Sequence, residues 1–414
     1  MNLVAPQRRP VANTREFRFA LLRSTAQLLA AQAAWDRLWI AAQAPYVLGF
    51  RFAFESWNCI HQPQGAALCC AVAYDAQRLV AVLPMVLRRR KLWMAATTGG
   101  PRAAENCDIL IEPGPRSPAL ATALVAEFCR LARPDFIEWD FVKAGSHLDL
   151  ALQGNPGLHV ARAVVDPCPY AELGTAVDWD SHLASLGKSY RSKVARKERR
   201  LQQLGRVAFE VLQGAPEPMI DWLFEHKRKW SERTNKRGDW VDSPHYQQFL
   251  RRLFASGPGF LVFVMTLDGA PIAVKLVALG GRSACLVMMT YDERYQEYSV
   301  GNVLDEFMMR TLFEHHRAAD GRHLDVDFGP GLERYKLHWS RDHRLEARSF
   351  AVAATPWGRA RFGFQRWIAR LRRGSSAAAG ARRAPGAQAG APPLDAADPL
   401  PEVAAGPGHG GQAR

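Results

Sequence analysis

Apolar residues in the first half of the chain follow two different spacings, which predict strands and a helix in a fixed order. The expected elements are strands at 67–74, 79–87 and 92–97, a helix at 117–133 and a strand at 136–142. A short polar segment joins the first two apolar runs, which indicates a hairpin. The helix shows helical spacing after a Ser-Pro start. The pattern therefore predicts a hairpin, a third strand, a helix and a last strand.

The second half repeats this order. Its expected elements are strands at 260–267, 271–279 and 284–291, a helix at 301–318 and a strand at 323–328. Asp268-Gly269 joins the first two of these strands, and this dipeptide is a strong hairpin turn. The same order of elements over a similar length indicates an internal duplication. We therefore expect an α/β chain with two lobes that are built alike.

Basic helices are expected between and after the two halves. Residues 188–200 carry seven Lys or Arg against the single acid Glu198, and residues 217–233 predict a second helix with several aromatic residues. Residues 356–373 predict a last basic amphipathic helix that is rich in aromatic residues. We expect it to pack on the second lobe, and the alternative is that it lies on an anionic membrane surface.

Length and composition suggest how the chain is divided. A chain of 414 residues is too long for one compact core, so two or three domains are expected. We place the first lobe at 16–165 and the second lobe, with its inserted basic helices, at 166–355. Residues 1–15 are expected to be a flexible tail. Residues 374–414 are rich in Ala, Gly and Pro and are expected to be disordered.

The net charge and the cysteines indicate which kinds of partner and which cellular compartment to expect. The net charge of +14 suits a polyanionic or phosphate-rich partner, although runs of Lys and Arg are also typical of solvated helix faces. We expect no DNA partner. The seven cysteines include no C-x-x-C, which is typical of free thiols in a reducing compartment. The sequence shows no secretory signal, no membrane span and no metal-ligand spacing. A cytoplasmic protein without a metal is therefore expected.

A candidate anion site lies where the helix of the second half begins. Ser299, Val300, Gly301 and Asn302 open this helix after a polar loop. Backbone N–H groups at a helix N-terminus carry partial positive charge, and a small residue there lets a pyrophosphate approach. Neither a P-loop nor a G-x-G-x-x-G after a strand is present, so ATP and NAD sites are not indicated. The site suits a nucleotide-type acyl donor, and the alternative is an ordinary helix start.

Candidate catalytic residues follow that helix. The strand HLDVDFG places Asp325 and Asp327 on one face, and Glu333, Tyr335 and Lys336 come after a Gly-Pro-Gly turn. Acyl transfer from a thioester needs a proton acceptor and an acid for the leaving group. Asp327 or Glu333 is a candidate base, and Tyr335 is a candidate acid. Lys336 is a candidate to stabilise a phosphate or a developing charge.

The alternative for these residues is structural. An internal salt-bridge cluster would join the two aspartates to Lys336, Arg334 or Arg191. For substrate binding we expect Arg191, Trp230 and Asp325.

Together these motifs resemble a known family. The basic SYRSKVARKERRL, the aromatic HKRKW, the hairpin LDGAPIAVKLVAL, the helix start S-V-G-N-V-L and the segment D-F-G-P-G-L-E-R-Y-K are similar to CelD/BcsL-type acetyltransferases. That family belongs to the GNAT superfamily and is similar to the FemAB-type aminoacyltransferases. The resemblance covers about residues 35–350. It implies tandem GNAT-like lobes, each a mixed, largely antiparallel sheet flanked by helices.

The resemblance also implies a donor site and a reaction. The GNAT donor loop Q/R-x-x-G-x-G/A corresponds to Gln296–Gly301, with Ser299 in place of the first Gly. The implied donor residues are Gln296, Ser299, Val300, Gly301 and Asn302. Only the second lobe is expected to bind donor, because Pro113 and Pro115 remove amide donors from the corresponding loop of the first lobe.

The implied activity is that of an N- or O-acyltransferase. It would move an acyl group, expected to be acetyl, from acyl-CoA to an amine or hydroxyl of a sugar-derived or small-molecule acceptor. The family's association with cellulose and exopolysaccharide production implies contact with polysaccharide-synthesis machinery. One alternative is a FemAB-like transferase that uses aminoacyl-tRNA and holds its phosphates on the basic helix. The other is an inert scaffold in a polysaccharide-synthesis complex.

Overall fold

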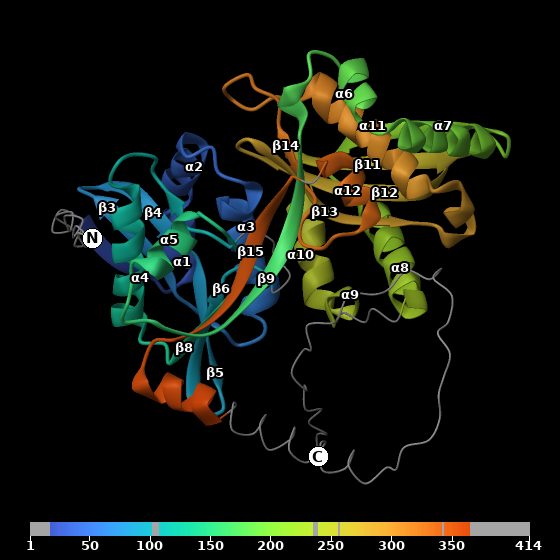
Figure 1. Ribbon diagram of the computed structural model, residues 1–414. Coiled ribbons are helices and arrows are strands. Elements are labelled where there is room, and N and C mark those ends of the chain that lie inside the picture. The colour runs from blue at the N-terminus through green and yellow to red at the C-terminus, as the bar shows by residue number, and fades with distance from the viewer. Residues whose placement is uncertain (1–16, 102–106, 235–238, 256, 342, 365–414) are drawn as a thin grey trace, which may run out of the picture. The chain divides into compact units, whose positions relative to one another are not determined.

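Two long strands join the two halves of the computed structural model, which describes residues 17–101, 107–234, 239–255, 257–341 and 343–364 (Figure 1). Strands β9 (His159–Glu172) and β15 (Arg344–Ala353) are antiparallel and paired along the whole of β15. On one side β9 pairs with β14 (Asp325–Asp327), and on the other β15 pairs with β8 (Phe136–Lys143). These pairs create one sheet of eleven strands, in the order β10-β11-β12-β13-β14-β9-β15-β8-β6-β5-β2.

The first half holds the elements before β9. They are β1 (Phe17–Leu22), α1 (Thr25–Ala30), α2 (Gln32–Ala41), η2 (Tyr46–Leu48), α3 (Phe50–Ser56), η3 (Trp57–His61), β2 (Ala67–Leu68), β3 (Cys70–Asp75), β4 (Arg78–Leu83), β5 (Met85–Arg90), β6 (Trp93–Thr98), β7 (Leu110–Ile111), α4 (Ser117–Ala132), β8 and α5 (His147–Gln153). The predicted hairpin is confirmed as β3 and β4. The strand expected at 79–87 is wrong as one element. It is interrupted at Pro84, which cannot donate a ladder hydrogen bond, and the chain passes there from a four-stranded sheet to the large one.

The second half holds the elements between β9 and β15. They are η4 (Leu173–Thr175), α6 (Trp179–Ser185), α7 (Lys188–Gln202), β10 (Val207–Gln213), α8 (Glu217–Thr234), α9 (Asp239–Asp242), α10 (Pro244–Phe254), β11 (Phe260–Leu267), β12 (Ala270–Gly280), β13 (Ser283–Tyr291), η5 (Glu293–Tyr298), α11 (Val300–His315), β14 and α12 (Arg334–Ser340). The hairpin at Asp268-Gly269 is confirmed as β11 and β12. Helices α6, α7 and α11 contribute to the core on one face of this sheet, whereas α8 and α10 contribute to the core on the other face.

The two halves share one unit of topology. Strands β6 and β8 are parallel neighbours separated in sequence by α4, and β13 and β14 are parallel neighbours separated by α11. Parallel neighbours need such a crossover, and the order hairpin, strand, helix, strand is as expected in both halves. The boundary expected at 165/166 falls inside β9, which belongs to the sheet of both halves. Apart from residue 364, the described residues belong to one compact unit, Met1–Gly363.

The last described helix packs on the first half and not, as expected, on the second. Residues 356–364 are helical. Trp357 stacks on Trp93 of β6 with ring centroids 5.7 Å apart, and Phe362 meets Phe136 of β8 edge-on at 5.9 Å. The expectation was wrong because an apolar helix face does not say which of two similar sheets it will cover. The remainder of the expected helix, 365–373, lies outside the described residues, as do both expected tails.

Two classes of feature are not found in the ranges that the structure describes. No group of three or more His, Cys, Asp or Glu side chains there is arranged to hold a metal ion. None of the helices there has the length and apolar character needed to cross a bilayer. The seven cysteines are free thiols.

A buried histidine gives the second half a predicted sensitivity to acid. His182 of α6 is 2% exposed, packs against the rings of Trp179 and Trp339, and neither ring nitrogen has a hydrogen-bond partner among the described residues. Burial lowers its pKa from 6.5 to about 4. Between pH 6.5 and about 4, this histidine therefore binds a proton in the unfolded chain but not in the folded chain. Stability from this group is complete above pH 6.5 and is lost as the pH falls towards 4.

We expect His182→Phe to raise the free energy of unfolding by about 1–2 kcal/mol at pH 7, because it removes two unsatisfied polar atoms. It should also remove up to about 3 kcal/mol of acid destabilisation between pH 6.5 and 4. Urea unfolding measured at several pH values tests both effects. His315→Gln, at an exposed position, is the control and should change neither. A His182→Phe protein less stable than the parent at pH 7 would contradict the prediction.

Candidate active site

The parallel strands β13 and β14 pair over a short length and then diverge. Their register runs from Ser283 opposite Asp325 to Cys285 opposite Asp327. The register between β12 and β13 shifts immediately afterwards, which marks a bulge in β13. A bulge bends its strand, and the chain after β14 turns away at Gly329, with φ 70°. Beyond Asp327 the two strands therefore separate on the side of their carboxyl ends.

The N-terminus of α11 lies at this same end, because the helix follows β13. The side chain of Ser299, the N-cap residue, makes no capping hydrogen bond, and the first-turn N–H groups carry the partial positive charge that attracts an anionic group. Ser299 has φ 52° and ψ 41°, the left-handed conformation that glycine adopts without strain. This explains why glycine suits the position and shows that serine still forms the same turn. Gln296 is exposed in η5, and its carbonyl accepts the Ser299 N–H at 3.0 Å.

The other predicted donor residues have different surroundings. A Cβ on Gly301 would lie 3.0 Å from Met289 Cε, a tight contact with the end of a flexible side chain, so glycine favours close packing of α11 against β13. Val300 is fully buried, and Asn302 is half-buried. Gly301 therefore helps α11 to pack in its place. Among the predicted donor residues in the first turn of α11, Asn302 is the one that is partly exposed.

The basic helix α7 lies beside the loop before α11. Lys197 Nζ donates to the Glu297 carbonyl, and Arg200 pairs with the Glu297 carboxylate at 3.1 Å. The Arg200 guanidinium also lies over the Tyr298 ring, 5.4 Å from its centre. These contacts hold a helix rich in Lys and Arg next to the N-terminus of α11. The two together make this end of the second half attractive to phosphate groups.

Asp327 is neutralised by a residue from the first half. Its Oδ2 pairs with Lys143 Nζ at 2.6 Å, and its Oδ1 accepts the Gly329 N–H at 2.9 Å. Burial alone would lower the pKa of Lys143, but attraction by Asp327 outweighs it and the pKa is raised. Both oxygens of Asp327 are therefore engaged, which makes it a poor proton acceptor. The salt-bridge alternative is correct in kind, but the partner is Lys143 and not Lys336, Arg334 or Arg191.

Asp325 instead faces a pocket of about 180 Å³ between the two halves. The pocket is lined by Gln43, Pro45, Cys107, Asp108, Lys143, Ser146, Arg282, Ser283 and Asp325. Burial and the neighbouring Glu172 raise the pKa of Asp325, and Arg282 opposes them. Burial also raises the pKa of Asp108, against hydrogen bonds from backbone amides such as that of Leu148 at 2.7 Å. The pocket thus holds two carboxyl groups whose pKa values are raised.

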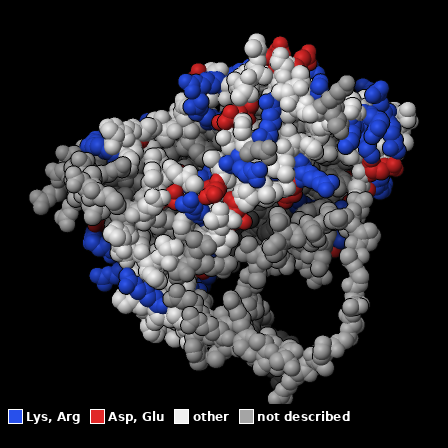
Figure 2. Space-filling view, viewed as in Figure 1, with Lys and Arg blue, Asp and Glu red and all other residues white. Residues whose placement is uncertain are grey.

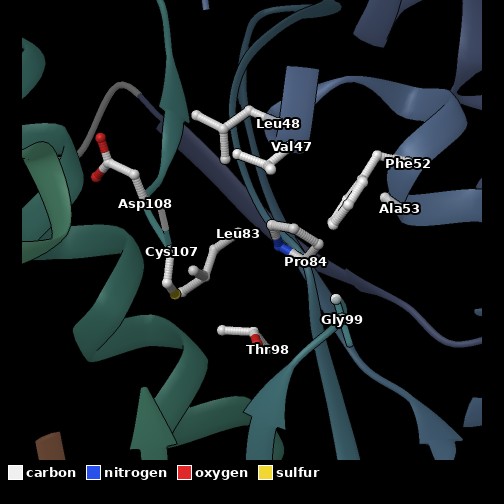
Figure 3. A pocket seen from close by; sticks show the side chains of 11 residues that line it. Val47, Leu48, Phe52, Ala53, Leu83, Pro84, Thr98, Gly99, Cys107 and Asp108 are labelled. Carbon is white, nitrogen blue, oxygen red and sulfur yellow. The ribbon is translucent and has the colours of Figure 1, made fainter. Parts of the chain in front are cut away.

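A smaller apolar pocket adjoins this one in the first half (Figure 3). The two pockets share Cys107 and Asp108, and Val47, Leu48 and Phe52 are among the apolar residues of the smaller one. Its volume of about 30 Å³ has room for a water molecule or two. It is an apolar extension of the larger pocket and too small to hold a ligand alone.

The predicted residues of α12 stabilise the turn after β14. Lys336 is buried and donates to the Pro330 carbonyl at 2.6 Å, and it pairs with Glu333 at 2.9 Å. Tyr335 packs edge-on against Phe328 at 6.3 Å. Lys336 thereby fixes the course of the chain beside the diverging strands, whereas Tyr335 is placed next to the residue that follows Asp327.

The predicted substrate-binding residues are not brought together. Arg191 lies on α7 and Trp230 on α8, and these helices cover opposite faces of the sheet. Lys227 Nζ lies over the Trp230 ring, 4.0 Å from its centre. Asp325 is the member of the predicted set that lines the pocket between the halves. A shared site for all three is therefore not formed.

Sequence reasoning missed a buried ion pair close to these residues. Lys275 of β12 pairs with Asp305 of α11, and the two side chains are 0% and 1% exposed. Lys275 Nζ also lies 5.6 Å from the centre of the Tyr335 ring. The sequence feature that could have revealed this pair is a lysine within the apolar run PIAVKLVAL, together with an aspartate on the apolar side of the helix that became α11. Such residues are rarely buried unless they are paired.

Comparisons with known proteins agree with this geometry. Residues 188–337 match the family described as an acetyltransferase (GNAT) domain. No curated protein matches the chain. The structure resembles the crystal structure of FemX, with 11% identity over 77% of this chain and 95% of that chain, and a TM-score of 0.56. It is also similar to a tandem GNAT protein from the clavulanic acid biosynthesis pathway, with 14% identity, coverage of 82% and 99%, and a TM-score of 0.47. The matched domain contains both diverging strands and α11, and the first half repeats their topology.

Proposed function

We propose that this chain, whose residues 188–337 match an acetyltransferase (GNAT) domain, moves an acyl group from acyl-CoA to an amine held between its two halves. The donor approaches the diverging strands β13 and β14 from the end where α11 begins. The acceptor approaches from the opposite end, through the pocket that Asp325 lines. The single observation that carries this proposal is that a pocket and the N-terminus of α11 lie at opposite ends of the same two parallel strands.

The spacing along the strand supports a meeting of the two substrates. Asp325 lines the pocket, and Asp327 marks the last pair before the strands diverge. Two residues along a strand span about 7 Å. An acceptor in the pocket would thus reach a donor group at the divergence, with the Lys143–Asp327 pair beside both.

The carboxyl groups of the pocket favour an amine over a hydroxyl. Asp325 can hold an ammonium group and accept its proton. The amine nitrogen then attacks the thioester carbonyl, the C–N bond forms and the C–S bond breaks. Asp325 keeps the ammonium proton during the attack and releases it to solvent afterwards. The second proton, which the nitrogen loses as the C–N bond forms, goes to the departing thiolate, and Tyr335 is the candidate to relay it. A sugar-derived amine and a role in polysaccharide production remain proposals that rest on the CelD/BcsL resemblance.

The donor site can be tested with a charge placed at the start of α11. We expect acetyl-CoA to raise the melting temperature of the parent protein by mass action. Asn302→Asp should weaken acetyl-CoA binding about tenfold, because it sets a negative charge where the phosphates would lie. The helix dipole should keep the unliganded variant at least as stable as the parent. Thermal shift and calorimetric titration measure both effects.

The matched control is Gln213→Glu, the same charge change at an exposed position of β10. It should bind acetyl-CoA like the parent. Equal binding by Asn302→Asp would remove the helix start from the donor site. If no acyl-CoA changes the melting temperature, the donor proposal itself is wrong.

A second donor class is favoured by one feature. Helix α7 presents exposed Lys193, Arg196 and Arg199 beside the donor end, which would also suit the phosphates of an aminoacyl-tRNA. Filter binding of tRNA at rising salt distinguishes the two donors. Tight binding with a steep salt dependence, together with no response to acyl-CoA, would favour the aminoacyl donor.

A further inference from the structure

The hairpin between β5 and β6 exposes an apolar residue next to cations. Leu92 lies at its tip and is 68% exposed. Arg89 and Lys91 precede it, and both are exposed. An exposed leucine by itself is ordinary. An exposed leucine next to cations and aromatic rings is less common. This hairpin lies far from the strands that diverge at Asp327.

Two tryptophans extend this apolar tip. Trp357 is 50% exposed, stacks on Trp93 with an angle of 26° between the rings, and donates its indole N–H to the Leu92 carbonyl at 3.4 Å. The contact holds the Trp357 ring beside Leu92. Tryptophan, with an apolar ring and one polar N–H group, is enriched where a bilayer meets water.

The charge around the tip is positive. Two acids lie nearby. Glu138 is paired with Arg90 at 2.9 Å and lies 4.0 Å from Arg361, and Asp135 accepts hydrogen bonds from the Met94 N–H at 2.8 Å and the Thr355 hydroxyl at 3.1 Å. Arg89, Lys91 and Arg359 remain exposed around the two apolar side chains. Figure 2 shows Lys and Arg along the lower left of the molecule, over the region where β5 and the last helix lie in Figure 1.

We propose that Arg89, Lys91, Leu92, Trp357 and Arg359, here called the hairpin surface, dock on an anionic lipid bilayer. The Leu92 and Trp357 side chains enter the headgroup region, and the cations contact the lipid phosphates. The sequence that follows supports this occupant, because residues 365–373 (QRWIARLRR) add four arginines and three large apolar residues without an acid. A nucleic acid would use the cations but not an aliphatic tip.

Sedimentation of the full chain with vesicles tests the proposal. At low salt, vesicles of phosphatidylglycerol and phosphatidylcholine should bind the protein, and pure phosphatidylcholine should not. The double variant R89E/K91E should weaken binding about 100-fold, since each cation near an anionic surface contributes about fivefold and the new carboxylates add repulsion. Leu92→Ser should weaken it about tenfold through lost apolar burial. Melting curves of each variant confirm that it is folded.

The matched control is R228E/K229E on α8, which changes the net charge by the same amount at exposed positions. It should bind vesicles like the parent. Equal losses in both double variants would show a general charge effect and overturn the proposal, as would binding that R89E/K91E leaves intact. A loss of binding to an RNA oligonucleotide in R89E/K91E, with vesicle binding unchanged, would assign the surface to nucleic acid instead.

Discussion

Lys275→Met is expected to lower the free energy of unfolding by about 3–5 kcal/mol, because it leaves a buried carboxylate without its cation. Lys275 and Asp305 are 0% and 1% exposed, and the second oxygen of Asp305 has no hydrogen-bond partner among the described residues. Burial lowers the pKa of Lys275 and raises that of Asp305. Each charge therefore depends on the other, and removal of one partner leaves the other with no compensating contact. Urea unfolding at pH 7 measures the loss.

Two further variants separate this effect from a simple loss of packing. The double variant K275M/D305L removes both charges and should regain most or all of the stability, since apolar residues of similar volume can replace a buried pair. Lys229→Met removes a cation from an exposed pair with Glu225 and should have little effect. If Lys275→Met and the double variant are equally unstable, the cost lies in packing and not in the unpaired carboxylate.

The order of the elements could be predicted from the sequence because it depends on local patterns. The hairpin at Asp268-Gly269 and the helices after β6 and β13 are set by turn residues and by spacing over a few residues. The partners of the strands depend on contacts between distant segments. Strand β9 contains two prolines and several charged residues, and local patterns did not predict it, yet it pairs with β14 on one side and with β15 on the other. Periodicity predicts a buried face but does not identify the element that buries it.

The same limit applies to the candidate site. The acids of HLDVDFG were found by their period of two, which places Asp325 and Asp327 on one face of the strand. Their different roles depend on Lys143, which is distant in sequence and pairs with Asp327 at 2.6 Å. The sequence predicted a salt bridge there but could not identify the cation. We accordingly propose Asp325, which lines the pocket, as the base in place of the predicted candidates Asp327 and Glu333.

Asp325→Asn should lower kcat by about 10²–10⁴-fold while leaving acyl-CoA binding unchanged, because it removes the proposed proton acceptor and keeps the size of the side chain. Asp325 must be deprotonated to act, so kcat should rise with pH through its pKa. Burial and the neighbouring Glu172 raise that pKa. Steady-state kinetics with an amine acceptor, together with calorimetric titration of acetyl-CoA, measure the two effects separately.

Glu172→Gln provides a test that a merely structural role for Asp325 would not satisfy. Glu172 lies opposite Asp325 on β9, and its negative charge raises the pKa of Asp325. Its removal should shift the rising limb of the pH profile to lower pH and leave kcat on the plateau unchanged. Full activity of Asp325→Asn would exclude this residue as the base. A pH profile that Glu172→Gln does not move would mean that the limb reports another group, such as the second pocket carboxyl, Asp108.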